Sequence, residues 1–155
     1  MNNSNPFLLT DDQIASFIID GYIIVEPELP DGYNQEIIDK LRAMPENPGE
    51  HIVESLPALN DLLSNPTIVG TLTSLLGHDY KRDQGGHIHM NPPGTRGQPW
   101  HQDERFGRGH QDRDVDDIRQ LMFMYYPQDV EPDMGPTVLL PGSHRRTASP
   151  ESMVT

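Results

Sequence analysis

The spacing of apolar residues changes close to residue 85, and this change constrains the fold more than any other feature of the sequence. Before it, apolar residues recur at helical spacing between residues that typically begin and end helices. After it, short β-type runs alternate with loops rich in proline, glycine and acidic residues. These runs are residues 87–90, 122–126 and 137–140. Helices followed by a sheet predict an α+β domain, mainly helical over residues 1–80 and β-rich over residues 85–155.

The first predicted helix has a signal at each end. Thr10 and Gln13 form a capping-box pattern, and Gly21 supplies the stop. The apolar face between them, at helical spacing, consists of Ile14, Phe17 and Ile18. Residues 22–25, with the sequence YIIV, then predict a short buried strand.

Three further helices are predicted before the change in pattern. Residues 34–44 and 56–63 each favour one. Asn65 followed by Pro66 is typical of an N-cap with proline at the first helical position, and Gly77 marks the end of that helix. Its expected buried stripe consists of Ile68, Val69, Leu72, Leu75 and Leu76. These helices carry no evident chemistry, so we interpret them as packing elements.

Composition limits the classes of function. The 155 residues show no compositional break, which predicts one domain. Lys and Arg number 11 against 24 Asp and Glu, and the net charge of −13 argues against a nucleic-acid ligand, which needs clustered positive charge. Because cysteine is absent, disulfides and thiolate metal ligands are excluded. The N-terminal residues lack a basic region and a long apolar run, so we expect a cytoplasmic protein without membrane contact.

The sequence WHQD places His101 and Asp103 two residues apart, just after a loop rich in proline and glycine. On an extended segment both side chains leave the same face and can converge on one metal ion. Two histidines and one carboxylate on one face of an octahedron leave three positions open, as in non-haem iron oxygenases. Spacing alone favours the alternative, a surface histidine beside a solvated carboxylate.

Three stretches surround and extend this motif in a fixed order: LTDDQIASFIIDGYIIVEPELP, PPGTRGQPWHQD and DMGPTVLLPGSHRR. Together they resemble the phytanoyl-CoA dioxygenase family of Fe(II)- and 2-oxoglutarate-dependent oxygenases. The resemblance implies helices flanking a double-stranded β-helix, which is a jelly-roll of the cupin type. It also implies that Fe(II), 2-oxoglutarate and O₂ act together on a small organic substrate, which would be hydroxylated.

Transferred residue by residue, the resemblance makes His101 and Asp103 the first two metal ligands. Asn91 matches a position where the family commonly has a polar group near 2-oxoglutarate. Strand alternation puts His89 and His87 on the same face as Asn91, so either could line the pocket, although a polar strand face often only meets solvent. Met124 and Tyr126 fall on the strand that borders the co-substrate in the family, and ordinary core packing is the alternative for both.

The family's third ligand is a distal histidine on a later strand, followed by an arginine that pairs with the far carboxylate of 2-oxoglutarate. In this sequence His144, Arg145 and Arg146 match a turn that precedes that histidine. The resemblance therefore predicts a single domain truncated at its C-terminus, with an incomplete β-helix that lacks its C-terminal strands. We expect such a chain to be inactive alone.

Two other patterns favour different functions. DRDVDD, residues 112–117, begins like a calcium loop but lacks the glycine and the glutamate that such a loop needs, so we interpret it as a solvated loop. The H-x-H of GGHIHMNPPG resembles a cupin metal site without its carboxylate. A cupin-like or zinc-type metal-binding protein and a non-catalytic remnant therefore stay open as alternatives to the oxygenase.

Overall fold

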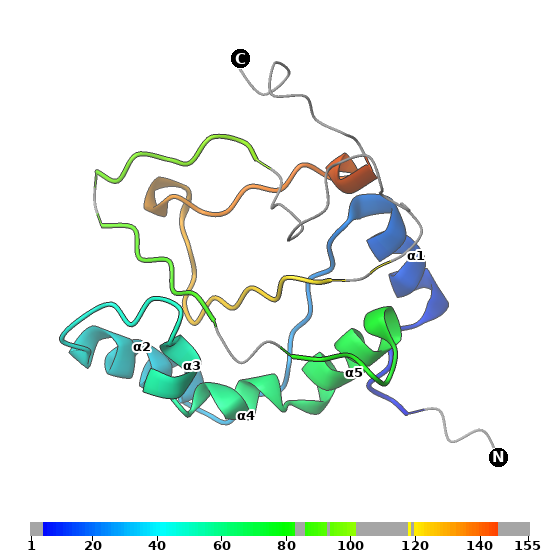
Figure 1. The fold of residues 1–155 in the computed structure, drawn as a ribbon, viewed down its shortest axis with the longest axis horizontal. Coiled ribbons are helices and arrows are strands. Elements are labelled where there is room, and N and C mark those ends of the chain that lie inside the picture. Colours follow the sequence, from blue (N-terminus) through cyan, green and yellow to red (C-terminus); the bar gives the residue numbers. More distant parts are fainter. Residues whose placement is uncertain (1–4, 83–85, 93, 102–117, 119, 146–155) are drawn as a thin grey trace.

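The computed structural model describes residues 5–82, 86–92, 94–101, 118 and 120–145. In Figure 1, helices α2 to α5 follow one another along one side, and extended segments of the second half of the chain lie beyond them. The α-helices are α1 (Asp11–Asp20), α2 (Tyr33–Ala43), α3 (Ile52–Ser55), α4 (Leu59–Leu63) and α5 (Pro66–Leu76). Among the described residues of the second half, the 3-10 helices η2 (Pro132–Met134) and η3 (Ser143–Arg145) interrupt the extended part. None of the described helices is long and apolar enough to cross a membrane.

Helix α1 begins and ends where its sequence signals predict. The Thr10 hydroxyl accepts a hydrogen bond from the Gln13 N–H at 3.3 Å, and the Gln13 side chain accepts one from the Thr10 N–H at 2.9 Å. Gly21 ends the helix with a φ of 83°, a left-handed conformation that glycine adopts without strain. The apolar face is narrower than expected, because Phe17 is buried whereas Ile18 is exposed.

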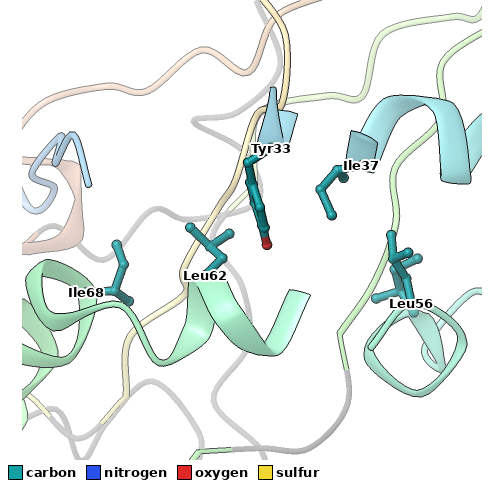
Figure 2. Close-up of a cluster of buried hydrophobic side chains, with 6 residues drawn as sticks. Tyr33, Ile37, Leu56, Leu62 and Ile68 are labelled. Atoms are coloured by element: carbon teal, nitrogen blue, oxygen red, sulfur yellow. The ribbon is translucent and has the colours of Figure 1, made fainter. Parts of the chain in front are cut away.

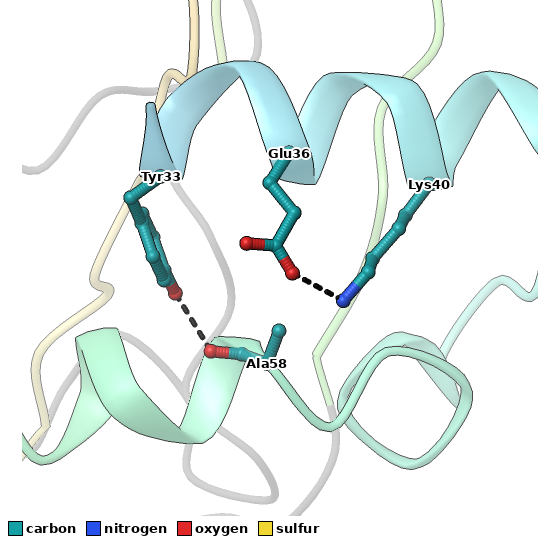
Figure 3. A network of polar contacts seen from close by, with 4 residues as sticks. All are labelled: Tyr33, Glu36, Lys40 and Ala58. Atoms are coloured by element: carbon teal, nitrogen blue, oxygen red, sulfur yellow. Dashed lines mark hydrogen bonds and ion pairs between the residues drawn. The ribbon is translucent and has the colours of Figure 1, made fainter. Parts of the chain in front are cut away.

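The core lies where α2 meets the short helices and α5 (Figure 2). Tyr33 combines an apolar ring with a polar end, and its hydroxyl donates a 2.7 Å hydrogen bond to the Ala58 carbonyl (Figure 3). Burial raises the pKa of Tyr33. On the exposed side of α2, Glu36 and Lys40 form an ion pair one turn apart. The buried cluster consists of Tyr33, Ile37, Ile52, Leu56, Leu62 and Ile68.

The prediction of one helix over residues 56–63 is wrong, because the chain forms two short helices, α3 and α4, with a break between them. Leu56 has φ −132° and ψ 75°, far from helical values. It precedes Pro57, whose ring disfavours the helical conformation in the residue before it. At this break the side chain of Leu56 packs in the buried cluster, and a new helix, α4, begins at Leu59.

Helix α5 has the predicted N-cap, since the Asn65 side chain accepts a 2.9 Å hydrogen bond from the Thr67 N–H. Its buried stripe is shifted from the prediction, because Val69 is exposed and Gly70 is buried. Gly70 lies against the backbone of Phe7, where a Cβ atom would overlap the Phe7 carbonyl. The N-terminal segment thus packs on α5, which helical periodicity alone does not reveal.

The β-type runs are extended, and in two of them, residues 87–90 and 122–126, side chains face the helices. Ile88, Phe123 and Tyr125 pack against the buried cluster. Within the described residues the one β-type pairing is a parallel bridge between His51 and Gly86. Residues 22–25 are also extended but not buried as predicted, since Ile24 is 80% exposed. Alternation turns only every second residue inward, which makes this segment half-buried.

Candidate functional site

His101 is the member of the predicted ligand pair that lies within the described residues. Its Nδ1 atom is 2.9 Å from the Pro99 carbonyl oxygen, which can only accept a hydrogen bond, so Nδ1 carries the proton. In this tautomer the lone pair of the ring is on Nε2. Metal-binding histidines commonly donate their other ring N–H to a backbone carbonyl in this way. The side chain of His101 therefore fits the chemistry of a metal ligand, while Asp103 lies outside the described residues.

The segment before the proline-rich loop presents its two histidines together. The rings of His87 and His89 are 4.7 Å apart between centroids, with an interplanar angle of 68°. Ile88 between them packs against the buried cluster, which turns both histidines to the opposite, exposed face. The prediction that His87 and His89 share a face is confirmed. Asn91, two residues further along, is also exposed.

Met124 and Tyr126 lie on the face of their segment that points away from the helices. Met124 is 41% exposed and Tyr126 is 46% exposed, so neither belongs to the helical core. The Tyr126 hydroxyl donates a 2.7 Å hydrogen bond to the Thr137 hydroxyl, which ties this segment to the run at residues 137–140. On the opposite face, the Tyr125 hydroxyl donates to the Asn34 side chain at 2.6 Å. The two faces of one segment thus have separate roles.

A set of contacts missed by sequence reasoning joins the turn at η3 to the end of α1. The Ile18 carbonyl accepts hydrogen bonds from His144 Nε2 at 3.1 Å and from Arg145 Nε at 3.0 Å. The Gly142 N–H donates to the Asp20 carbonyl at 2.8 Å. These carbonyls belong to the last turn of the helix and lack partners inside it, so the η3 turn caps α1 from more than 120 residues away. We call this set of contacts the α1 clamp.

The α1 clamp bears on the role of His144. The resemblance placed this histidine in a turn and not among the ligands, and the structure puts it in a 3-10 turn against α1. The sequence held one signal for the contact between His144 and α1. Both residues of the contact, Ile18 and His144, lie in stretches that carry the family resemblance. Arg146 and the acidic loop at residues 112–117 lie outside the described residues.

Over the described part of the chain, no group of three or more His, Asp or Glu side chains surrounds a common point where a metal ion could bind. A hollow of about 630 Å³ in that part lies at the start of α2 and is open to solvent. Tyr33, Asn34 and Asp31 line it together with Pro127 and Gln128 of the second half. It contains one carboxylate and no histidine, so it does not resemble a metal centre.

Comparison with known proteins places the chain in a family. Residues 31–154 match the model of the phytanoyl-CoA dioxygenase (PhyH) family. No curated protein and no solved structure matches the chain. The matched region covers most of the sequence, from the start of α2 through the WHQD motif to the η3 turn. The chain therefore belongs to the phytanoyl-CoA dioxygenase family, a family of oxygenases.

Proposed function

We propose that this chain forms the iron-binding part of an Fe(II)- and 2-oxoglutarate-dependent dioxygenase that hydroxylates a small organic substrate. Family membership supports the class of reaction. The observation that carries the assignment of the site is the hydrogen bond from His101 Nδ1 to the Pro99 carbonyl, because it favours metal binding through Nε2.

In this proposal His101 Nε2 and the Asp103 carboxylate hold the iron. With 2-oxoglutarate and O₂, bound iron supplies the oxidation of a C–H bond to an alcohol, with succinate and CO₂ as the other products. Pro99 keeps the proton on Nδ1 and fixes the orientation of the His101 ring. A fixed ring loses less freedom on binding the metal, so the carbonyl contributes to affinity without touching the ion.

The residues around the pair have proposed roles in holding the co-substrate. The Asn91 amide donates to a carboxylate oxygen of 2-oxoglutarate, and His89 lies on the same side of the segment. Met124 and Tyr126 border the co-substrate and keep water from it. The hydrogen bond between Tyr126 and Thr137 supports this role, because it holds the tyrosine ring on the face that points away from the helices.

The proposed fold around this site is the double-stranded β-helix, to which the runs at residues 87–90, 122–126 and 137–140 would each contribute a strand. The proposed set has two protein ligands, whereas the facial arrangement has three. We therefore expect the 155-residue chain to bind Fe(II) weakly. Succinate formation should require a third ligand and a cation for the far carboxylate of 2-oxoglutarate.

Anaerobic calorimetry with Fe(II) tests the assignment of the ligands. We expect His101→Ala and Asp103→Ala each to weaken Fe(II) binding by about tenfold or more, because each removes one direct ligand. His78→Ala is the matched control, since His78 is an exposed histidine that follows α5 and has no part in the proposed site. Unchanged Fe(II) affinity in either ligand variant would overturn the assignment.

A further inference from the structure

His87 and His89 form a pair whose backbone is held in place at two points, one before the pair and one between the two histidines. The Gly86 N–H donates a 3.2 Å hydrogen bond to the Glu50 carbonyl, which attaches the start of the segment to the turn before α3. Ile88 packs against the buried cluster. The two exposed rings therefore stand beside each other on a supported segment, with their centroids 4.7 Å apart.

We propose that His87 and His89 form a second metal site, a two-imidazole chelate for copper(II), nickel(II) or zinc(II), separate from the pair His101 and Asp103. Imidazole nitrogen binds these ions at about 2.0–2.1 Å, so two nitrogens that share one ion lie roughly 3 Å apart. Neighbouring exposed rings reach that separation by rotating their side chains, without any movement of the backbone. Water completes the coordination.

The donor set determines which metals the site takes. Two neutral imidazoles without a carboxylate favour copper(II) over nickel(II) and zinc(II), and they bind manganese(II) and magnesium poorly. A pair that includes a carboxylate, as proposed for iron, is less selective against the ions that prefer oxygen. The net charge of −13 attracts cations of any kind to the surface and so assists both sites.

The second site shares His89 with the proposed co-substrate pocket, but it does not rest on iron binding by His101. It depends only on the two rings and their support, and it is present whether or not His101 binds iron. The two assignments therefore fail separately. Loss of Fe(II) binding in a His101 variant bears on the first site, and loss of copper(II) binding in the His87 and His89 variants bears on the second.

The test is a copper(II) titration of the 155-residue chain, followed by proton NMR of the histidine rings and by competition with a chromophoric chelator. At substoichiometric copper(II), we expect selective broadening of the ring signals of His87 and His89, identified through His87→Gln and His89→Gln. Each substitution should weaken copper(II) binding by about tenfold or more, which corresponds to about 1.4 kcal/mol. Because both side chains are exposed, circular dichroism should remain unchanged in both variants.

His78→Gln serves as the control and should retain the affinity of the original chain within about twofold, because His78 is exposed and has no part in either proposed site. Zinc(II) and nickel(II) should compete for the site, and manganese(II) and magnesium should not. Equal broadening of all seven histidines would overturn the proposal. So would a double variant of His87 and His89 that binds copper(II) as tightly as the original chain.

Discussion

The contacts of the α1 clamp predict how substitutions at Gly21 and His144 change the free energy of unfolding. A Cβ atom at Gly21 would overlap Nδ1 of His144, so Gly21→Ala has to displace the imidazole. The left-handed φ of 83° costs alanine about 1 kcal/mol, and loss of the His144 hydrogen bond to Ile18 costs about 1 kcal/mol more. We therefore expect Gly21→Ala to lower the free energy of unfolding by about 2 kcal/mol and His144→Ala by about 1 kcal/mol.

The two substitutions should not be additive. Once His144→Ala has removed the imidazole, Gly21→Ala adds only the backbone term, so the double variant should lose about 2 kcal/mol and the coupling should be about 1 kcal/mol. Urea unfolding followed by circular dichroism measures all four chains. Gly32→Ala is the matched control, because Gly32 has a similar φ of 77° and a Cβ atom added there would meet nothing within 4 Å. Additivity within about 0.3 kcal/mol would refute the contact.

Three further predictions concern the helical core and its neighbours. Leu62→Ala should lower the free energy of unfolding by about 2–5 kcal/mol, because the side chain is fully buried. In the same urea assay, Lys40→Ala at the exposed ion pair should change the free energy of unfolding by less than about 0.5 kcal/mol. Tyr33→Phe should cost about 1 kcal/mol, because the Ala58 carbonyl loses the hydrogen bond from the tyrosine hydroxyl and keeps only the one from the Asp61 N–H. No change in the free energy of unfolding would show that the hydrogen bond from the hydroxyl has no net value. Burial raises the pKa of Tyr125 to about 12, so the contribution of this tyrosine to stability is complete below pH 10 and falls as the pH rises towards 12. Urea unfolding at pH 10 and at pH 12 should therefore show a smaller loss of unfolding free energy in Tyr125→Phe than in the original chain.

Local signals in the sequence were reliable where the interacting residues are close along the chain. The capping box at Thr10 and Gln13 and the N-cap at Asn65 each join residues two or three positions apart, so their residue types fix the contact. The helix over residues 56–63 failed for a local reason as well. There the apolar spacing favoured a helix, but the ring of Pro57 disfavours the helical conformation at Leu56, so the helix does not form across these residues.

Contacts between distant residues could not be read from periodicity. The shift of the buried stripe in α5 comes from Phe7, which covers Gly70, and the end of α1 is satisfied by a turn more than 120 residues away. At the candidate site, alternation correctly placed His87 and His89 on one face. It gave no information about the Pro99 carbonyl that determines the tautomer of His101, because that contact depends on the path of the loop.

The helices carry no proposed ligand, yet each β-type run is attached to them. The run at residues 87–90 is held through Ile88, which packs against the buried cluster, and the run at residues 122–126 through the contact between Tyr125 and Asn34. The run at residues 137–140 leads directly into the α1 clamp. The contacts of Ile88 and Tyr125 with the helical layer thus determine which face of the first two runs points away from it.

This attachment explains why the proposed site residues lie on the outward face. In an extended segment, fixing one side chain against the helices sends its neighbours to the opposite side. Ile88 therefore directs His87 and His89 outward, and Tyr125 does the same for Met124 and Tyr126. It follows that substitutions in the helical layer should disturb metal binding without touching a ligand. They remove the contacts that orient the extended segments, and those segments carry the metal-binding side chains.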